Sequence, residues 1–314
     1  MTVETFESLR PLLFAIAYRM LGTVSEAEDV VQEAFLRYRR AVAGRAEIGS
    51  LKAYLSAVVT RLAIDELRSA RRRRETYVGA WLPEPLLTDA GRDDPAAHLE
   101  QAESLSMAFL LLLQRLSPPE RAAFLLHDVF NYGYAEIARI IDTSEANSRQ
   151  LASRARRRVE SERPRFEPSR RARDELAARF FAAATNGDLD GLVRMLGADA
   201  TVYGDGGGRA PQWMTPITGA DRVARLFAGL GRQAGELSLR IELRQVNGQP
   251  GALVLDADGG LINVFALDIA DGLVQTIRSV INPDKLGHIG PVADARAVLR
   301  RTASTAGGDE GPVS

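Results

Sequence analysis

The segment from Ser117 to Val159 predicts short helices joined by tight turns, and no other stretch constrains the fold of this chain as strongly. Ser117 and Glu120 form an S-x-x-E capping box, with Pro118 at the first helical position. Asp142 to Ser144 then interrupts and re-caps the chain after a short amphipathic helix with three isoleucines on one face, Ile137, Ile140 and Ile141. This pattern is typical of a helix-turn-helix unit.

The last helix of this unit carries five arginines: Arg149, Arg154, Arg156, Arg157 and Arg158. A capped, arginine-rich helix after a three-residue turn fits the major groove of DNA, where phosphate contacts fix its register. The alternative is an ordinary helical hairpin whose arginines face solvent. Because motif and charge agree, we expect this unit to bind DNA.

Composition excludes several classes of protein. The chain of 314 residues has no cysteine, so disulfides, zinc fingers and thiolate catalysis are excluded. Its three histidines lie far apart, which argues against a histidine metal site, and no glycine-rich Walker or dinucleotide loop suggests a cofactor. The apolar run Met107 to Leu113 is too short to cross a bilayer, and no secretory signal is visible. We expect a cytoplasmic protein with no cofactor, no metal and no membrane partner.

The net charge of −1 conceals two basic clusters. Five arginines fall between Arg68 and Arg74, and five more fall between Arg149 and Arg158. Six acidic residues and one arginine lie between Glu84 and Glu103. An acidic connector therefore separates two segments suited to phosphate contact.

The patterns predict three domains. We expect an all-α domain at residues 1–75, an acidic, proline-containing linker at 76–95 and a second all-α domain, the helix-turn-helix, at 96–163. An α+β domain follows at 170–289, because two helices split at residues 186–188 and a third at 220–230 precede alternating strands from Leu237 onward. The Ala/Gly-rich end, 290–314, is expected to be a flexible tail.

In the first domain, Ser25 and Glu28 predict the start of a long helix. One of its faces, at i, i+3 and i+4 spacing, presents Asp29, Gln32, Glu33 and Leu36. The sequence of this helix resembles the part of bacterial extracytoplasmic-function sigma factors that holds the β′ clamp helices of RNA polymerase. The resemblance implies that these four residues contact core polymerase, which sigma factors also meet at the β flap. A solvated helix face is the alternative.

The long helix that follows, residues 51–74, resembles the sigma-factor reader of the promoter −10 element. The resemblance implies that a flipped base is captured beside the loop Arg45 to Ser50 and Thr60. It places three arginines near phosphates: Arg61, Arg68 and Arg71. Many relatives carry Asn where Thr60 stands.

The helix-turn-helix resembles sigma domain 4, the reader of the −35 element. By this resemblance Arg149, Gln150 and Arg154 face promoter DNA, and Ser148 replaces the usual aliphatic residue.

Three short motifs narrow the resemblance. WLPEP (81–85), DGGGR (205–209) and NPDKL (282–286) resemble the signatures of sigma factors of this type that carry a fused SnoaL-like domain, a cone of curved sheet and helices. The resemblance implies that the C-terminal domain packs on the linker and tunes sigma activity in cis. The implied contact residues are Trp81, Pro83, Pro85, Asp205, Gly206, Arg209, Asn282, Asp284 and Lys285.

Two other functions stay open on sequence alone. The first is a SnoaL-type enzyme, of the cyclase or isomerase kind, with a DNA-binding appendage. Its pocket would be lined by Asp205, Tyr203, Trp213 and His288. The second is a stand-alone helix-turn-helix regulator. A small-molecule ligand of the C-terminal domain also stays open, as does the question of whether that domain inhibits or activates.

Overall fold

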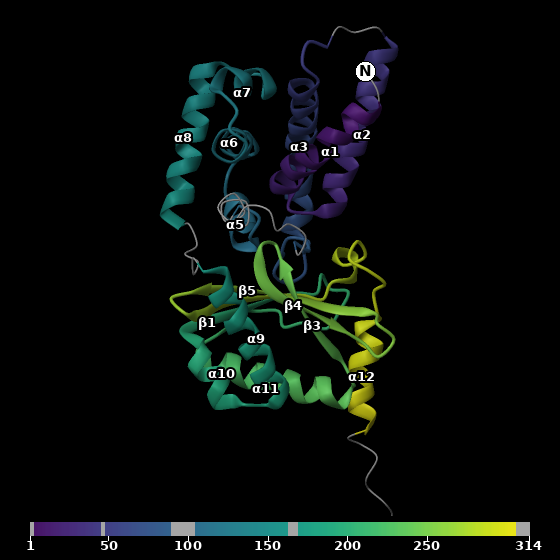
Figure 1. Ribbon diagram of the computed structural model, residues 1–314, viewed down its shortest axis with the longest axis vertical. Coiled ribbons are helices and arrows are strands. Elements are labelled where there is room, and N and C mark those ends of the chain that lie inside the picture. Colours follow the sequence, from purple (N-terminus) through teal and green to yellow (C-terminus); the bar gives the residue numbers. More distant parts are fainter. Residues whose placement is uncertain (1–2, 45–47, 89–103, 163–168, 306–314) are drawn as a thin grey trace, which may run out of the picture. The chain divides into compact units, whose positions relative to one another are not determined.

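A computed structural model describes residues 3–44, 48–88, 104–162 and 169–305 of this chain (Figure 1). The chain divides into two compact units. The first unit comprises Met1–Thr76 and Ala108–Pro164, and the second comprises Tyr77–Met107 and Arg165–Ser314. The beginning of the predicted linker therefore belongs to the same unit as the C-terminal domain.

Three long helices open the first unit: α1 (Val3–Leu21), α2 (Val24–Ala43) and α3 (Leu51–Glu75). Each packs against the other two. The apolar stripe of α2 explains this packing, because Val24, Ala27, Val30, Val31, Ala34 and Tyr38 recur at helical spacing and are buried.

The predicted start of α2 is wrong by two residues. Its N-cap is Thr23 rather than Ser25, and the Thr23 hydroxyl donates to Glu26 at 2.6 Å. Gly22 precedes the cap with a φ of 79°. This left-handed backbone turns the chain between α1 and α2, so the helix begins immediately after it.

The helix-turn-helix comprises α5 (Met107–Leu113), α6 (Pro118–Phe124), the π-helical turn η1 (Leu125–Val129), α7 (Tyr134–Ile140) and α8 (Glu145–Glu162). The capping box of Ser117 and Glu120 is confirmed. Ser144 caps α8 as predicted, accepting a hydrogen bond from the backbone N–H of Asn147 at 3.1 Å. Asp142, with a φ of 55°, makes the turn between α7 and α8.

The second unit contains one six-stranded sheet in the order β2-β1-β6-β5-β4-β3. Its strands are β1 (Leu196–Asp205), β2 (Ile217–Thr218), β3 (Arg240–Val246), β4 (Gln249–Leu255), β5 (Leu261–Ala270) and β6 (Leu273–Val280). Strands β1 and β6 are parallel, and the other neighbours are antiparallel. The meander predicted from residue 237 is confirmed, whereas β1 was not predicted.

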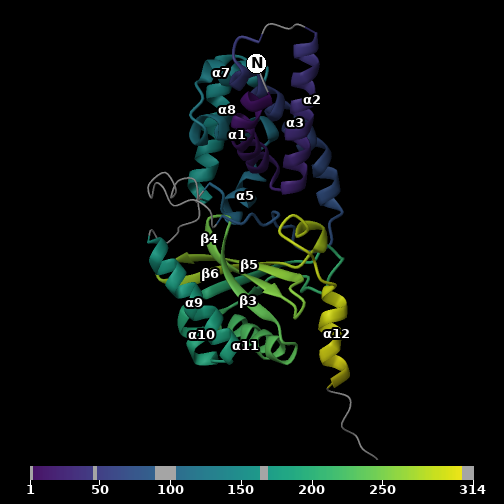
Figure 2. The same cartoon turned by 45° about the vertical axis from the view of Figure 1, so that its right-hand side comes forward.

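Helices α9 (Arg170–Asn186), α10 (Leu189–Met195) and α11 (Ala220–Glu236) lie on one face of the sheet (Figures 1 and 2). Four phenylalanine rings join α9 and α11 to strand β5 of the sheet, with neighbouring ring centroids 5.0 to 6.1 Å apart: Phe180, Phe181, Phe227 and Phe265. The short turn η2 (Pro283–Lys285) follows β6. Residues Ala295–Thr305, expected in a flexible tail, form α12. No helix among the described residues is long and apolar enough to cross a membrane.

Candidate functional site

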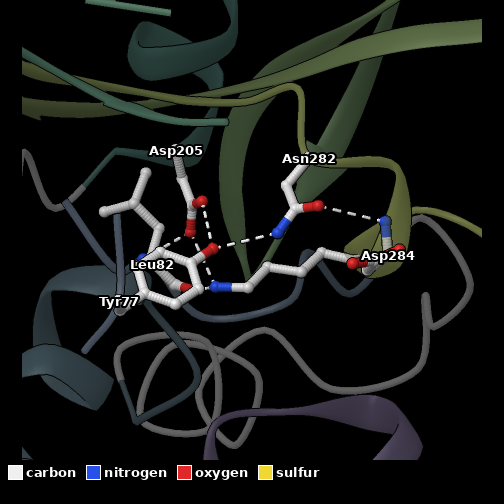
Figure 3. Close-up of polar contacts among 6 residues, drawn as sticks. Tyr77, Leu82, Asp205, Asn282 and Asp284 are labelled. Atoms are coloured by element: carbon white, nitrogen blue, oxygen red, sulfur yellow. Dashed lines mark hydrogen bonds and ion pairs between the residues drawn. The ribbon is translucent and has the colours of Figure 1, made fainter. Parts of the chain in front are cut away.

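The candidate site is the surface of the second unit on which residues 77–88, the docked connector segment, lie. Strands β1 and β6 run parallel, so their carboxyl ends meet at the same edge of the sheet, where Asp205 is in register with Val280. The two loops that follow these strands carry the DGGGR and NPDKL motifs. This topology brings together three side chains from distant parts of the sequence: Asp205, Asn282 and Lys285 (Figure 3).

Asp205 is fully buried and lies at the centre of this site. Its carboxylate accepts a hydrogen bond from the backbone N–H of Leu82 at 2.8 Å and one from the Tyr77 hydroxyl. It also forms an ion pair with the Lys285 ammonium, at 2.6 Å (Figure 3). Burial, followed by the hydrogen bond to Asp205, raises the pKa of Tyr77 well above its ordinary value.

Lys285 completes the recognition of the connector backbone. Its ammonium donates to the carbonyl of Leu82, so Asp205 and Lys285 together bond both backbone polar groups of that residue. The same ammonium lies 4.5 Å from the centre of the Trp81 ring and 4.9 Å from that of Tyr77. A cation between two aromatic faces, paired with a buried carboxylate, holds the connector in one register.

Asn282 positions this lysine. Its side chain accepts from the backbone N–H of Asp284 at 3.1 Å, which caps η2, and donates to the Tyr77 hydroxyl at 2.9 Å. Asp284 itself is exposed and forms an ion pair with the exposed Arg209 at 3.3 Å. Arg209 and Asp284, two of the predicted contact residues, are therefore bonded to each other by this ion pair.

The DGGGR turn needs glycine at its centre. Gly207 and Gly208 have φ values of 55° and 70°, in the left-handed region. A Cβ on Gly207 would lie 2.3 Å from the side-chain nitrogen of Asn282 and 2.9 Å from the Tyr77 hydroxyl oxygen. A side chain there would displace the residues that hold the connector.

A second set of bonds holds residues 86–88, which the sequence did not predict. Asn247 is fully buried in the hairpin between β3 and β4, and its side chain accepts from the backbone N–H of Leu86 at 2.9 Å. Its own N–H donates to the carbonyl of Leu86 at 2.7 Å, and Thr88 donates to the carbonyl of Gln245 at 2.9 Å. Leu87 bridges Val246 in antiparallel fashion at this edge of the sheet.

The prolines of WLPEP are buried, and their missing N–H groups leave only carbonyls to satisfy. The carbonyl of Pro85 is 2.7 Å from the Nε2 of His288. Glu84 is also buried, with a carboxylate oxygen 4.0 Å from the Nδ1 of His288. WLPEP therefore contributes one aromatic face and a series of backbone contacts.

The predicted polymerase-binding residues share one side of α2. Asp29, Gln32 and Leu36 are exposed, and Leu36, at 37% exposure, is one of the few large apolar side chains among the described residues that are open to solvent. Glu33 pairs with Arg37 at 2.9 Å, a hydrogen bond that lowers the pKa of Glu33.

The predicted −10 residues differ in their exposure and in their bonding partners. Thr60 is fully buried, and its hydroxyl has no hydrogen-bond partner among the described residues. Arg61 donates from its guanidinium to the carbonyls of Ile140 and Arg139, both at 2.8 Å, at the end of α7. Arg68 is exposed and pairs with Asp65 at 3.2 Å. The Arg71 side chain and residues 45–47 of the loop Arg45 to Ser50 lie outside the described part of the chain.

The contact between α3 and α7 continues beyond Arg61. The Ser56 hydroxyl is 2.7 Å from that of Tyr132, in the turn before α7. Arg121 of α6 is buried and donates to the carbonyl of Met20 at the end of α1. The helix-turn-helix is therefore packed on the N-terminal helices within the first unit.

The predicted −35 residues Arg149, Gln150 and Arg154 lie on one exposed face of α8, around a shallow hollow. Arg149 pairs with Glu145 at 3.1 Å and lies over the ring of Tyr134, and Arg154 pairs with Glu120 at 3.2 Å. Ser148 is buried, and its hydroxyl donates to the Ser144 carbonyl at 3.1 Å. This bond satisfies a polar side chain where an aliphatic residue was expected.

The C-terminal domain also encloses a cavity of about 120 Å³. Of the four residues expected to line a pocket, only Trp213 lines this one. Asp205, Tyr203 and His288 are not among the residues that line this cavity. Asp205 and His288 instead bond the connector segment, because β1 places the Asp205 side chain at the edge where that segment lies.

These features define a class of protein. The family model of sigma-70 region 2 matches residues 5–73, that of sigma-70 region 4 matches 106–159, and that of the SnoaL-like domain matches 177–280. Two sigma regions, an intervening connector and a SnoaL-like domain that binds it constitute a sigma factor with a fused C-terminal domain.

The chain is 40% identical to the extracytoplasmic-function RNA polymerase sigma factor SigJ of Mycobacterium tuberculosis, over 95% of this chain and 96% of SigJ. It is 33% identical to the probable sigma factor SigI of the same organism, over 88% of this chain and 92% of SigI. The crystal structure of SigJ matches with a TM-score of 0.72, covering 93% of this chain and 100% of that one. The chain belongs to the extracytoplasmic-function sigma factors.

Proposed function

We propose that this sigma factor binds core RNA polymerase through the exposed face of α2 and reads promoter DNA with α3 and α8, while its C-terminal domain tunes both readers by holding the connector. The partners are the β′ clamp helices and β flap of core polymerase, and promoter DNA, in the cytoplasm. The connector site distinguishes this sigma factor from one that consists of the two sigma regions alone.

The observation that carries the proposal is the bonding of Leu82. Its N–H and carbonyl are both taken by one buried ion pair, Asp205 and Lys285, of the C-terminal domain. Leu82 lies between the two sigma regions, which match residues 5–73 and 106–159. Residues 77–88 could span about 40 Å when extended. When they are docked, this length is no longer available to link the two sigma regions. The length of free connector, and hence the reach between the two promoter readers, depends on whether this site is occupied.

The packing of α3 on α7 supports a resting state within the first unit. Arg61, which resemblance assigns to a promoter phosphate, donates instead to the carbonyls of Ile140 and Arg139. These bonds use two of the five N–H groups of the guanidinium and hold the side chain against the end of α7. In this proposal promoter binding draws Arg61 away from α7, so that α3 and α7 separate, and the connector length limits how far they move.

The enzyme alternative is less well supported. None of the described residues that line the cavity carries an ionisable side chain, so general acid or base catalysis has no candidate group there. Asp205 and His288 bond the connector. A stand-alone regulator would have no use for the polar face of α2 or for a second reader.

Transcription in vitro with core polymerase and a cognate promoter tests the proposal. Charge reversal of the α2 face, Asp29→Arg with Glu33→Arg, should abolish promoter-dependent initiation, because it replaces one exposed and one half-buried carboxylate at the proposed interface by cations. Asp258→Arg, a reversal at an exposed position in the turn after β4, should leave initiation unchanged. Initiation by the α2 variant at the wild-type level would overturn the assignment of this face, and DNA binding without initiation by the wild-type chain would favour the stand-alone regulator.

A further inference from the structure

The ring of Tyr134, at the start of α7, contacts side chains from two other elements of the helix-turn-helix. It stacks on the ring of His127 in η1, with the two ring centroids 4.1 Å apart and an angle of 27° between the planes. The guanidinium of Arg149 in α8 lies over the same tyrosine ring, with its central carbon 4.9 Å from the ring centre. One aromatic side chain therefore links η1, α7 and α8.

Local bonds fix the position of this ring. Tyr134 is the first residue of α7, and the Gly133 N–H before it donates to the Glu136 carboxylate at 3.0 Å, which closes the cap of the helix. The Nδ1 of His127 is 3.0 Å from the carbonyl oxygen of Tyr132. Because a carbonyl oxygen only accepts, Nδ1 carries the hydrogen, and this bond orients the imidazole. The tyrosine ring therefore has a fixed backbone and a fixed neighbour.

Arg149 is held in place but remains accessible. Besides lying over Tyr134, it pairs with Glu145 one turn earlier at 3.1 Å, and its side chain is still 63% exposed. An arginine side chain loses conformational freedom when it binds a base, and this loss is smaller when the guanidinium is already held. A positioned guanidinium can donate two parallel hydrogen bonds to O6 and N7 of guanine in the major groove. Arg149 is therefore prepared for contact with a base.

The other predicted −35 arginine is held differently. Arg154 pairs with Glu120 of α6 at 3.2 Å, and within the described ranges no aromatic ring lies under its guanidinium. A change at Tyr134 should therefore affect Arg149 and leave Arg154 in place.

We propose that Tyr134 is a positioning residue for promoter recognition: its ring holds the Arg149 guanidinium where it reads one base pair of the −35 element. The inference rests on the proposed reading of promoter DNA by α8, and it adds a residue that acts through Arg149.

Competition between promoters tests this role. Holoenzyme reconstituted from the full chain and core polymerase is bound to a labelled cognate promoter and competed with promoters substituted at single positions of the −35 element. Arg149→Ala should abolish discrimination at one position, which identifies the base pair that Arg149 reads. Tyr134→Ala should weaken discrimination at that position about two- to fivefold and leave the other positions unchanged. Tyr134→Phe, which keeps the ring, should discriminate like the wild type.

A double variant separates positioning from an independent contact. Tyr134→Ala combined with Arg149→Ala should bind the cognate promoter as tightly as Arg149→Ala alone, because Tyr134 acts through Arg149. Discrimination is a ratio of two affinities measured on one sample, so a partly unfolded fraction does not change it. Tyr134→Leu, which keeps apolar bulk but has no aromatic face, should show the same loss of discrimination and replaces Tyr134→Ala if that variant does not fold.

The possible failures can be told apart. Wild-type discrimination by Tyr134→Ala or Tyr134→Leu at the Arg149 position would overturn the inference, as would an additive loss of affinity in the double variant. Unchanged discrimination by Arg149→Ala at every position would instead overturn the assignment of Arg149 in the proposed function, and the inference with it.

Discussion

Asp205 and Lys285 form a buried ion pair, 2.6 Å apart, whose two members bond the N–H and the carbonyl of the same residue, Leu82. Asp205 is the last residue of β1 and Lys285 lies in η2, which follows the parallel strand β6. The pair binds a segment more than a hundred residues earlier in the chain. Each charge is compensated only while the other is present, because the pair is almost fully withdrawn from solvent. The connector is therefore held through an electrostatic element that a single substitution disrupts.

Replacement of Asp205 by Asn should release the connector. The variant leaves the Lys285 ammonium buried without its partner, a change that costs about 3–5 kcal/mol. Cleavage of the connector by a protease measures the release, as does the fluorescence of Trp81 in chains whose other tryptophan, Trp213, is replaced by Phe. Asp284→Asn in the same site removes only an exposed ion pair with Arg209 and should cost less than about 1 kcal/mol. Equal protease resistance of the two variants would contradict the role of Asp205.

Substitution of Gly207 by Ala should weaken docking more than the same change at another left-handed glycine. A Cβ on Gly187, whose φ is 66°, would have no atom within 4 Å, so Gly187→Ala carries only backbone strain, about 1–2 kcal/mol. Gly207→Ala adds a clash with Asn282 and Tyr77. Denaturant unfolding compares their stabilities, and Trp81 fluorescence should change in the Gly207 variant alone. A Trp81 change in both variants would argue against a local effect.

Docking should weaken in alkaline solution. The pKa of Tyr77 is raised in the docked state, so the undocked segment loses this proton first. The stabilising contribution is complete below pH 10 and falls as the pH rises above the ordinary tyrosine value of about 10. Release of a single proton limits the slope to about 1.4 kcal/mol per pH unit. Because Tyr77 is only partly buried, solvent screening reduces the total change. Trp81 fluorescence between pH 8 and 11 measures this change, and Tyr77→Phe should flatten it; an unchanged slope in that variant would assign the effect to another group.

Arg61→Ala should loosen the contact between α3 and α7. It removes two bonds from a charged donor to the carbonyls of Ile140 and Arg139, together worth roughly 1–3 kcal/mol at this largely exposed position. Hydrogen exchange should quicken at the end of α7. Arg68→Ala, which removes an exposed arginine that among the described residues pairs with Asp65 of its own helix, serves as the control. Unchanged exchange at α7 in the Arg61 variant would contradict a closed resting state.

Local patterns in the sequence predicted most of the helices and the meander. The capping box at Ser117 and the alternation after Leu237 depend on neighbours only, and both are present. Strand β1 was missed because glycine, alanine and aspartate dilute its apolar residues. Its pairing with β6 is a long-range contact that no local pattern records.

The candidate site was predictable where motifs marked it. WLPEP, DGGGR and NPDKL indicated Trp81, Asp205, Asn282 and Lys285 as neighbours, whereas Tyr77 and Asn247 carry no such mark. Tyr77 bonds Asp205 across 128 positions, and Asn247 bonds Leu86 across 161. Asn247 followed by Gly248 is typical of a hairpin turn, and that pattern does not record a contact with a distant segment.

The most direct test of connector control is transcription in vitro on a series of promoters that differ only in the spacing between the −10 and −35 elements. The wild-type chain and Asp284→Asn should share one preferred spacing. Asp205→Asn, with its connector shown to be released by protease cleavage, should initiate over a broader or shifted range of spacings. An identical spacing profile for the released variant and the wild type would contradict the account.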